Sequence, residues 1–151
     1  MSKETIRIEL EARETEWEIK PGQNVAGYGY NGQVPGPVIE AIQGVPIEVR
    51  FTNRLSEPTL IHWHGLRHEA KDDGVPGLNQ DPIMPGDSFY YEFRVTDPPG
   101  MYVFHSHFNS AEQVGKGLYG AFIVEPPGGR WRPVYGVEPD VEADLFMGDG
   151  P

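Results

Sequence analysis

The sequence predicts a single all-β domain, folded as a sandwich or barrel of short strands. A chain of 151 residues suits one domain and can bury about 68–70% of its unfolded surface. Apolar and polar residues alternate in several short runs, as they do in strands with one buried face. Between the runs stand 19 glycines and 15 prolines, and such frequent breaks favour antiparallel strands over alternating strands and helices.

The strands are predicted in order along the chain. Residues 6–10 alternate apolar with charged side chains, and the pattern resumes at residues 17–19 after a charged turn. Further strand-like runs cover residues 45–51, 59–64, 88–95, 101–107 and 118–124. The only helical stretch expected is a turn or two near residues 110–115.

The chain is expected to divide into a domain and a tail. Residues 1–127 hold all the predicted strands, whereas residues 128–151 are rich in proline, glycine and acidic residues, as is typical of a linker. The apolar trio Leu145-Phe146-Met147 either folds back on the domain or begins a strand of a further domain. We favour the second interpretation.

The charge and the missing cysteines exclude several functions. A formal net charge of −11 makes nucleic acid and anionic membranes poor partners. The chain has no cysteine, which excludes disulfides, zinc–thiolate sites and a blue-copper centre, whose metal needs a thiolate. Residues 1–5 lack the apolar core of a secretory signal, and no window approaches membrane-spanning length, so we expect a soluble chain. Its compartment stays open, because a signal removed beforehand would leave the same sequence.

The five histidines gather in two short segments, His62-Trp63-His64 with His68 nearby, and His105-Ser106-His107. Both pairs lie in predicted strands, where residues i and i+2 point to the same face. On neighbouring strands, four imidazoles would meet at one place, and imidazoles without a thiolate suit copper, zinc, iron or nickel. Trp63 and Ser106 would point to the other face, Trp63 as core packing without a redox role. His68 follows the expected end of the strand, so we interpret it as a loop residue and not as a fifth ligand.

Longer motifs surround these histidines: Ile61-His62-Trp63-His64-Gly65-Leu66, Asp73-Gly74-Val75-Pro76, Gln80-Asp81-Pro82-Ile83, Pro85-Gly86, the run from Gly100 to His107 and the run from Gly117 to Val124. In their order and spacing they resemble the first cupredoxin domain of the multicopper oxidases, which include laccases and their bacterial relatives. The resemblance implies a single cupredoxin-like domain, a Greek-key β-sandwich. It also implies copper as the cofactor and a share in a trinuclear copper cluster that reduces O₂ to water.

The resemblance also implies a role for individual residues. By the family pattern His62 would bind the mononuclear copper of the cluster. His64 and His105 would share one copper of the coupled pair, and His107 would hold the other. Asp73 matches the acid that assists proton delivery during O₂ reduction, although an aspartate before glycine is also an ordinary turn residue. Members of this family are often extracytoplasmic.

The chain departs from the family pattern in what it lacks. A complete oxidase draws further histidines and the blue-copper cysteine from a later domain, and four histidines cannot fill the coordination of three coppers. The chain is therefore either an isolated first domain that needs a partner domain, or a copper protein whose identical subunits share clusters, for example in a trimer.

Two alternatives come from other classes of protein. His62, His64, Glu69 and His105 loosely match the metal site of the cupins, which would indicate a mononuclear iron, manganese or zinc enzyme. That interpretation leaves His107 unexplained. In a purely structural or interaction module the histidines would be incidental, and a strong stabilisation of the fold by copper would exclude this interpretation.

Overall fold

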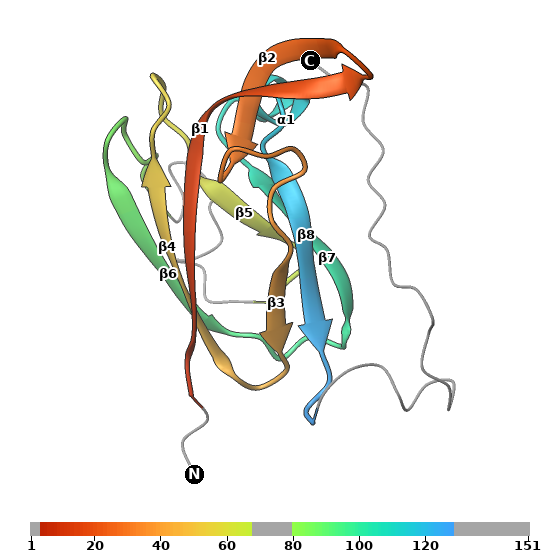
Figure 1. The fold of residues 1–151 in the computed structure, drawn as a ribbon. Coiled ribbons are helices and arrows are strands. Elements are labelled where there is room, and N and C mark those ends of the chain that lie inside the picture. The colour runs from red at the N-terminus through yellow and green to blue at the C-terminus, as the bar shows by residue number, and fades with distance from the viewer. Residues whose placement is uncertain (1–3, 68–79, 129–151) are drawn as a thin grey trace.

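The computed structural model describes residues 4–67 and 80–128 and places them in two four-stranded sheets (Figure 1). The strand order is β2-β1-β4-β6 in one sheet and β3-β8-β7-β5 in the other. In chain order the elements are β1 (Ile6–Lys20), β2 (Gln23–Tyr30), β3 (Ile39–Ile42), β4 (Pro46–Asn53), β5 (Ile61–His64), β6 (Ser88–Arg94), β7 (Gly100–Ser106), α1 (Ser110–Gly115) and β8 (Tyr119–Glu125). The predicted all-β sandwich and its short helix are confirmed.

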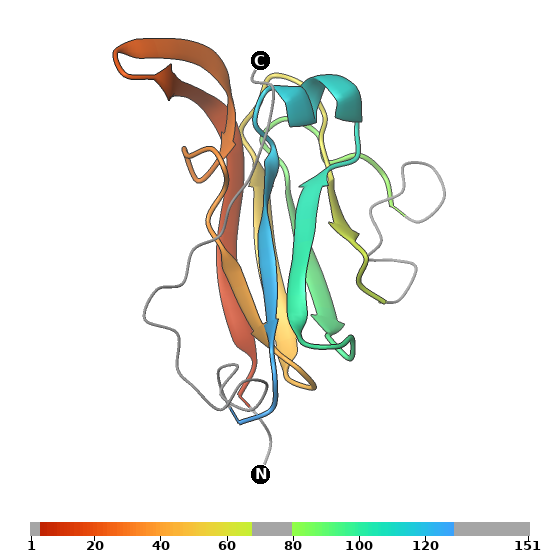
Figure 2. The same ribbon diagram turned by 90° about the vertical axis from the view of Figure 1, so that its right-hand side faces the viewer.

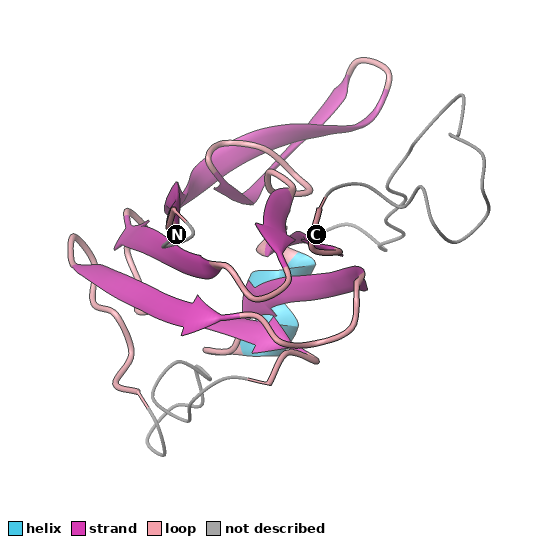
Figure 3. Ribbon diagram, turned by 90° about the horizontal axis from the view of Figure 1, so that it is seen from below, coloured by secondary structure: helices cyan, strands magenta, loops and turns pink. Residues whose placement is uncertain are grey.

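The core lies between the sheets because alternate residues of each strand point inward. In β4, for example, Ile47, Val49 and Phe51 are buried. The end-on view in Figure 3 shows the sheets as two layers, with α1 across the far end of the sandwich. The buried apolar residues of both layers form one continuous cluster, which gives the histidine-bearing strands a rigid support.

Trp63 is part of this core, as predicted. Its side chain is fully buried, and its ring centroid lies 5.3 Å from that of Tyr91 and 5.7 Å from that of Phe104. The Tyr91 hydroxyl, which belongs to the opposite sheet, accepts the backbone N–H of Ile61 at 3.0 Å. The start of β5 is therefore tied to both layers.

The N-terminal strand is longer than predicted. Residues 6–20 form one strand, so the predicted turn between residues 10 and 17 is wrong. The first half pairs with β4, and the second half pairs with β2 in a hairpin that projects beyond the sandwich (Figure 2). Backbone hydrogen bonds to β2 hold this second half, and they do not require an alternating apolar face.

Two strands have no counterpart in the prediction, and two pairings differ from it. β2 was not predicted because Gly27 and Gly29 interrupt the alternation of apolar and polar side chains along it. β3 was not predicted because it has only four residues. The pairings of β1 with β4 and of β3 with β8 are parallel, whereas only antiparallel strands were expected. From β3 to β7 the chain passes back and forth between the sheets, so these neighbouring strands are not joined by hairpins.

The histidine-bearing strands β5 and β7 are antiparallel neighbours, and β5 is an edge strand. In their register His62 lies opposite His105, and Ile61 lies opposite Ser106. The predicted adjacency of the two strands therefore holds. The division between residues 1–127 and 128–151 stays a prediction, because residues 129–151 lie outside the described part of the chain.

Candidate metal centre

The imidazoles lie on the outer face of the sheet that contains β5 and β7. Trp63 and Ser106, which alternate with the histidines, point inward and are fully buried. His62, His105 and His107 are half-buried, and His64 is exposed. Because side chains alternate along a strand, the core residues and the histidines point to opposite faces of the sheet. The histidines are therefore accessible from outside the sandwich.

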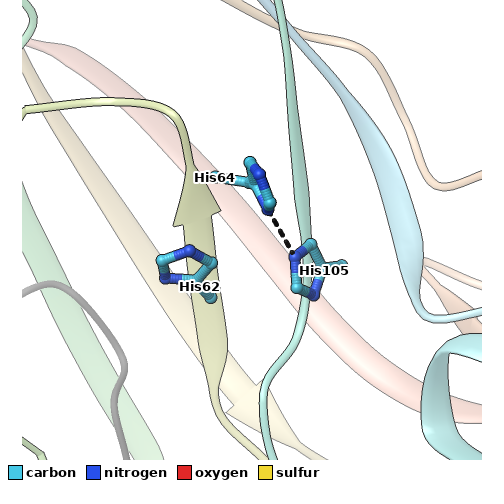
Figure 4. Close-up of side chains that lie close together, drawn as sticks. All are labelled: His62, His64 and His105. Carbon is cyan, nitrogen blue, oxygen red and sulfur yellow. Dashed lines mark hydrogen bonds between the residues drawn. The ribbon is translucent and has the colours of Figure 1, made fainter. Parts of the chain in front are cut away.

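Three of the histidines form one group, which Figure 4 shows in close-up. One ring nitrogen each from His62, His64 and His105 lies within 4.8 Å of the others. The shortest of these contacts joins His64 Nδ1 and His105 Nε2, which are 3.2 Å apart. Metal–nitrogen bonds of about 2.0–2.1 Å, as for zinc, put two nitrogens on one ion about 3–4 Å apart, so small movements of these rings would suffice to bind an ion.

His107 lies beside this group but outside it. Its ring stacks on that of His62, with centroids 4.9 Å apart and planes inclined by 27°. The centroid of His105 is farther away, at 6.2 Å. His107 comes one residue after the end of β7, and its backbone N–H donates to the carbonyl of Leu60 at 3.2 Å. The structure therefore brings all four predicted histidines to one place, three as a group and the fourth against His62.

The hydrogen bonds of His105 determine which of its nitrogens faces the other rings. Its Nδ1 lies 2.8 Å from the backbone carbonyl of Ser106, and because a carbonyl only accepts, Nδ1 must carry the proton. In the neutral ring Nε2 then keeps its lone pair and points toward His64. Metal-binding histidines have this same arrangement, in which one ring N–H donates to a carbonyl and the other nitrogen binds the ion.

The electrostatics of the site favour the neutral form of His105. Burial lowers the pKa of this imidazole below its ordinary value, and the proximity of His62, His64 and His107 lowers it further. The hydrogen bond to the Ser106 carbonyl opposes this shift in part. A neutral imidazole is the form that binds a metal ion, so the lowered pKa of His105 suits a metal ligand. The four imidazoles fit copper by the chemistry of their donor atoms.

Three residues considered in the sequence lie outside the described residues: His68, Glu69 and Asp73. The structure consequently does not place the predicted proton-delivering acid or the glutamate of the cupin alternative. Over residues 4–67 and 80–128, no helix is long and apolar enough to cross a membrane.

Comparisons with known proteins agree on one family. The family model described as multicopper oxidase matches residues 11–129. The chain is 38% identical over 136 residues to an L-ascorbate oxidase of Cucurbita pepo var. melopepo, which covers 88% of this chain and 23% of that protein. It is 45% identical over 102 residues to Laccase-1 of Cryptococcus neoformans var. grubii, which covers 66% of this chain and 16% of that protein.

Solved structures give the same result. A multi-copper oxidase from Pseudomonas thermotolerans superposes with a TM-score of 0.80 at 43% identity, over 83% of this chain and 30% of that one. A blue copper oxidase from Nitrosomonas europaea superposes with a TM-score of 0.77 at 35% identity, over 83% of this chain and 40% of that one.

The architecture and the histidine group are those of a cupredoxin-like copper domain. The chain belongs to the multicopper oxidase family, and copper is the cofactor that this membership implies. The chain spans about a sixth to a quarter of the length of the curated relatives that it matches. Membership of this family leaves no support for the cupin alternative.

Proposed function

We propose that this domain supplies one half of a trinuclear copper cluster, with His62, His64, His105 and His107 as its ligands. The observation that carries the proposal is the orientation of His105. Its Nδ1 proton is engaged by the Ser106 carbonyl, and its Nε2 faces His64. When bound, copper would supply the redox chemistry by which O₂ is reduced to water.

Each histidine is assigned its part by the family pattern. His62 would hold the mononuclear copper, and His64 and His105 would share one copper of the coupled pair. His107 would hold the other copper of that pair, next to His62. Asp73, in the Asp73-Gly74-Val75-Pro76 motif of the sequence, would deliver protons during O₂ reduction, with its carboxyl as the donor.

The other half of the site must come from elsewhere. The chain has no cysteine and hence no blue-copper site through which electrons could enter. The histidines lie on the outer face of the sheet, and His64 is exposed, so a second domain can add ligands from the opposite side. The greater length of the relatives supports a further domain as that partner. We therefore assign oxidase activity only to the complete assembly.

An identical subunit is the second candidate for this partner. The open outer face and the incomplete ligand set suit a shared site between copies of the chain as well as they suit a second domain. Copper stoichiometry and molecular mass in solution separate the two. Clusters shared between subunits require that copper stoichiometry and oligomeric state depend on each other, whereas a copper-loaded chain that is strictly monomeric would exclude them.

Titration of the chain with Cu²⁺, monitored by calorimetry and by Tm, tests the proposed ligands. Both His64→Ala and His105→Ala should remove most of the copper-dependent rise in Tm, because a ligand that binds only the folded state stabilises it. His68→Ala is the matched control and should leave the rise nearly intact. Equal losses in all three variants would contradict the proposed ligand set.

A further inference from the structure

A single buried amide joins the two histidine-bearing segments from the inner side of the sheet. It belongs to Gln113, the one buried residue of α1, whose side chain is fully enclosed. Its Oε1 accepts the hydroxyl of Thr59 at 2.8 Å and that of Ser106 at 2.5 Å. Its Nε2 donates to the carbonyl of Pro58 at 2.9 Å.

These three contacts reach both histidine pairs. Pro58 and Thr59 lead into β5, and Thr59 is three residues ahead of His62. Ser106 lies between His105 and His107. Because Ser106 points inward while its neighbours point outward, the amide of Gln113 lies on the face of the sheet opposite to the imidazoles. It links the segment that leads into β5 to the end of β7.

The link matters most for His107, which lies beyond the paired strands. The regular pairing of β5 with β7 ends at Ile61 and Ser106. Beyond this last pair, the two segments are joined by a long hydrogen bond, from the His107 N–H to the Leu60 carbonyl, at 3.2 Å. The Phe108 N–H donates to the Ser106 hydroxyl at 3.3 Å. Strand pairing thus fixes His62, His64 and His105, whereas the position of His107 also depends on the hydroxyl that Gln113 holds.

From this geometry we infer that Gln113 is a positioning residue that holds His107 against His62 so that both can bind the copper cluster. The inference rests on the proposed function, since it concerns the same four ligands. Gln113 acts through the Ser106 hydroxyl on one segment and through Thr59 and Pro58 on the other.

The contacts explain why the residue is a glutamine. Two hydroxyls need an acceptor with two free lone pairs, and the Pro58 carbonyl needs a donor within reach of the same side chain. Leucine fills a similar volume but pairs with none of the three groups. A carboxylate would accept both hydroxyls, but it would leave the carbonyl unpaired and place a charge in the core.

A double-mutant cycle on copper affinity tests this role. Gln113→Leu should weaken Cu²⁺ binding by about ten- to a hundredfold, the usual effect of removing a group that orients metal ligands. In a His107→Ala background the same substitution should change the affinity by less than about twofold, because the ligand that Gln113 positions is gone. In a His64→Ala background it should keep its full effect.

Two further variants separate positioning from stability. Asn53 is a matched control: its amide is also fully buried and makes three hydrogen bonds, to the backbone of Leu55, Glu57 and Ile83. Asn53→Leu should lower Tm about as much as Gln113→Leu, yet leave copper affinity unchanged while the chain is folded. Ser106→Ala is a milder change that stays interpretable if Gln113→Leu does not fold. It should weaken binding in the same direction, and again only when His107 is present.

The outcomes are distinct. If the unsubstituted chain binds no copper, both the proposed function and the inference fail. If the unsubstituted chain binds copper, two results would show that the positioning role is wrong while leaving the proposed ligand set standing. One is a Gln113→Leu variant that binds copper as tightly as the unsubstituted chain. The other is an equal loss of copper affinity when Gln113→Leu is made in the His107→Ala background. The electron paramagnetic resonance spectrum of bound Cu²⁺ gives a readout independent of affinity. Gln113→Leu should reproduce the spectrum of His107→Ala, and a spectrum like that of the unsubstituted chain would overturn the inference.

Discussion

Gly120 gives a direct test of how tightly the core packs behind the histidines. It lies in β8 opposite Phe104 of β7, and a Cβ at this position would fall only 2.6 Å from Cε1 of the Phe104 ring. Phe104 is fully buried, with its ring centroid 5.2 Å from that of Tyr30 and 5.7 Å from that of Trp63. The ring cannot give way without moving both neighbours.

The expected cost of Gly120→Ala follows from these contacts. Overpacking a well-packed core destabilises a fold by about 1–3 kcal/mol. Replacing a strand glycine by alanine returns about 0.5–1 kcal/mol, because the unfolded chain loses freedom. Because the added Cβ would overlap a fully buried ring, the overpacking cost should fall in the upper part of its range, at about 2–3 kcal/mol. The net loss is then about 1–2.5 kcal/mol, which at an m-value of about 2 kcal/mol/M lowers the urea midpoint by about 0.5–1.3 M.

The assay is urea unfolding followed by tryptophan fluorescence, with two companion variants. Gly115→Ala is the matched control: it lies in α1, where an added Cβ meets no atom within 4 Å. It should stabilise the chain by about 0.5–1 kcal/mol. Phe104→Leu should recover part of the loss when combined with Gly120→Ala, because it removes the ring that clashes. A Gly120→Ala chain as stable as the unsubstituted one would refute the reasoning.

Three further predictions concern pH, a buried hydroxyl and copper removal. Because the pKa of His105 is lowered in the folded state, the unfolded state binds a proton first as the pH falls through about 6.5. The urea midpoint of the metal-free chain should therefore fall from pH 7.5 to pH 5.5, and less so in His105→Ala; a midpoint that rises would contradict the shift. Tyr91→Phe leaves the Ile61 N–H and the Gln80 amide without the hydroxyl to which they donate. The free energy of unfolding measured in urea should fall by about 1–3 kcal/mol. An unchanged free energy of unfolding would exclude a structural role for the Tyr91 hydroxyl. A chelator should lower the Tm of copper-loaded chain, reversing a stabilisation of about 2.7 kcal/mol at a hundredfold excess of copper over Kd; an unchanged Tm would mean that copper does not bind the folded state.

The sequence was sufficient to predict where the histidines gather. A period of two places residues i and i+2 of a strand on one face, so the sequence alone predicts that His62 and His64 point together, and likewise His105 and His107. His107 proves to lie one residue beyond the end of β7, yet its ring still lies against that of His62. The structure adds that the strands are neighbours and that His62 lies opposite His105. The same alternation correctly assigned Trp63 to the core.

Other features could not be predicted, because they depend on partners remote in the chain. The charged stretch of β1 has no apolar alternation, and it is a strand only because β2 pairs with it. The parallel pairings depend on how the chain passes between the sheets. Gln113 looks like a surface residue in a polar helix, and its contact with Thr59 spans 54 positions of sequence.

The central claim is that His62, His64, His105 and His107 bind copper together. Anomalous diffraction at the copper edge, from crystals grown with Cu²⁺, tests it most directly. We predict copper density bonded to Nε2 of His105 and within reach of the other three rings. Copper found only at surface carboxylates, with these four imidazoles unoccupied, would contradict the account.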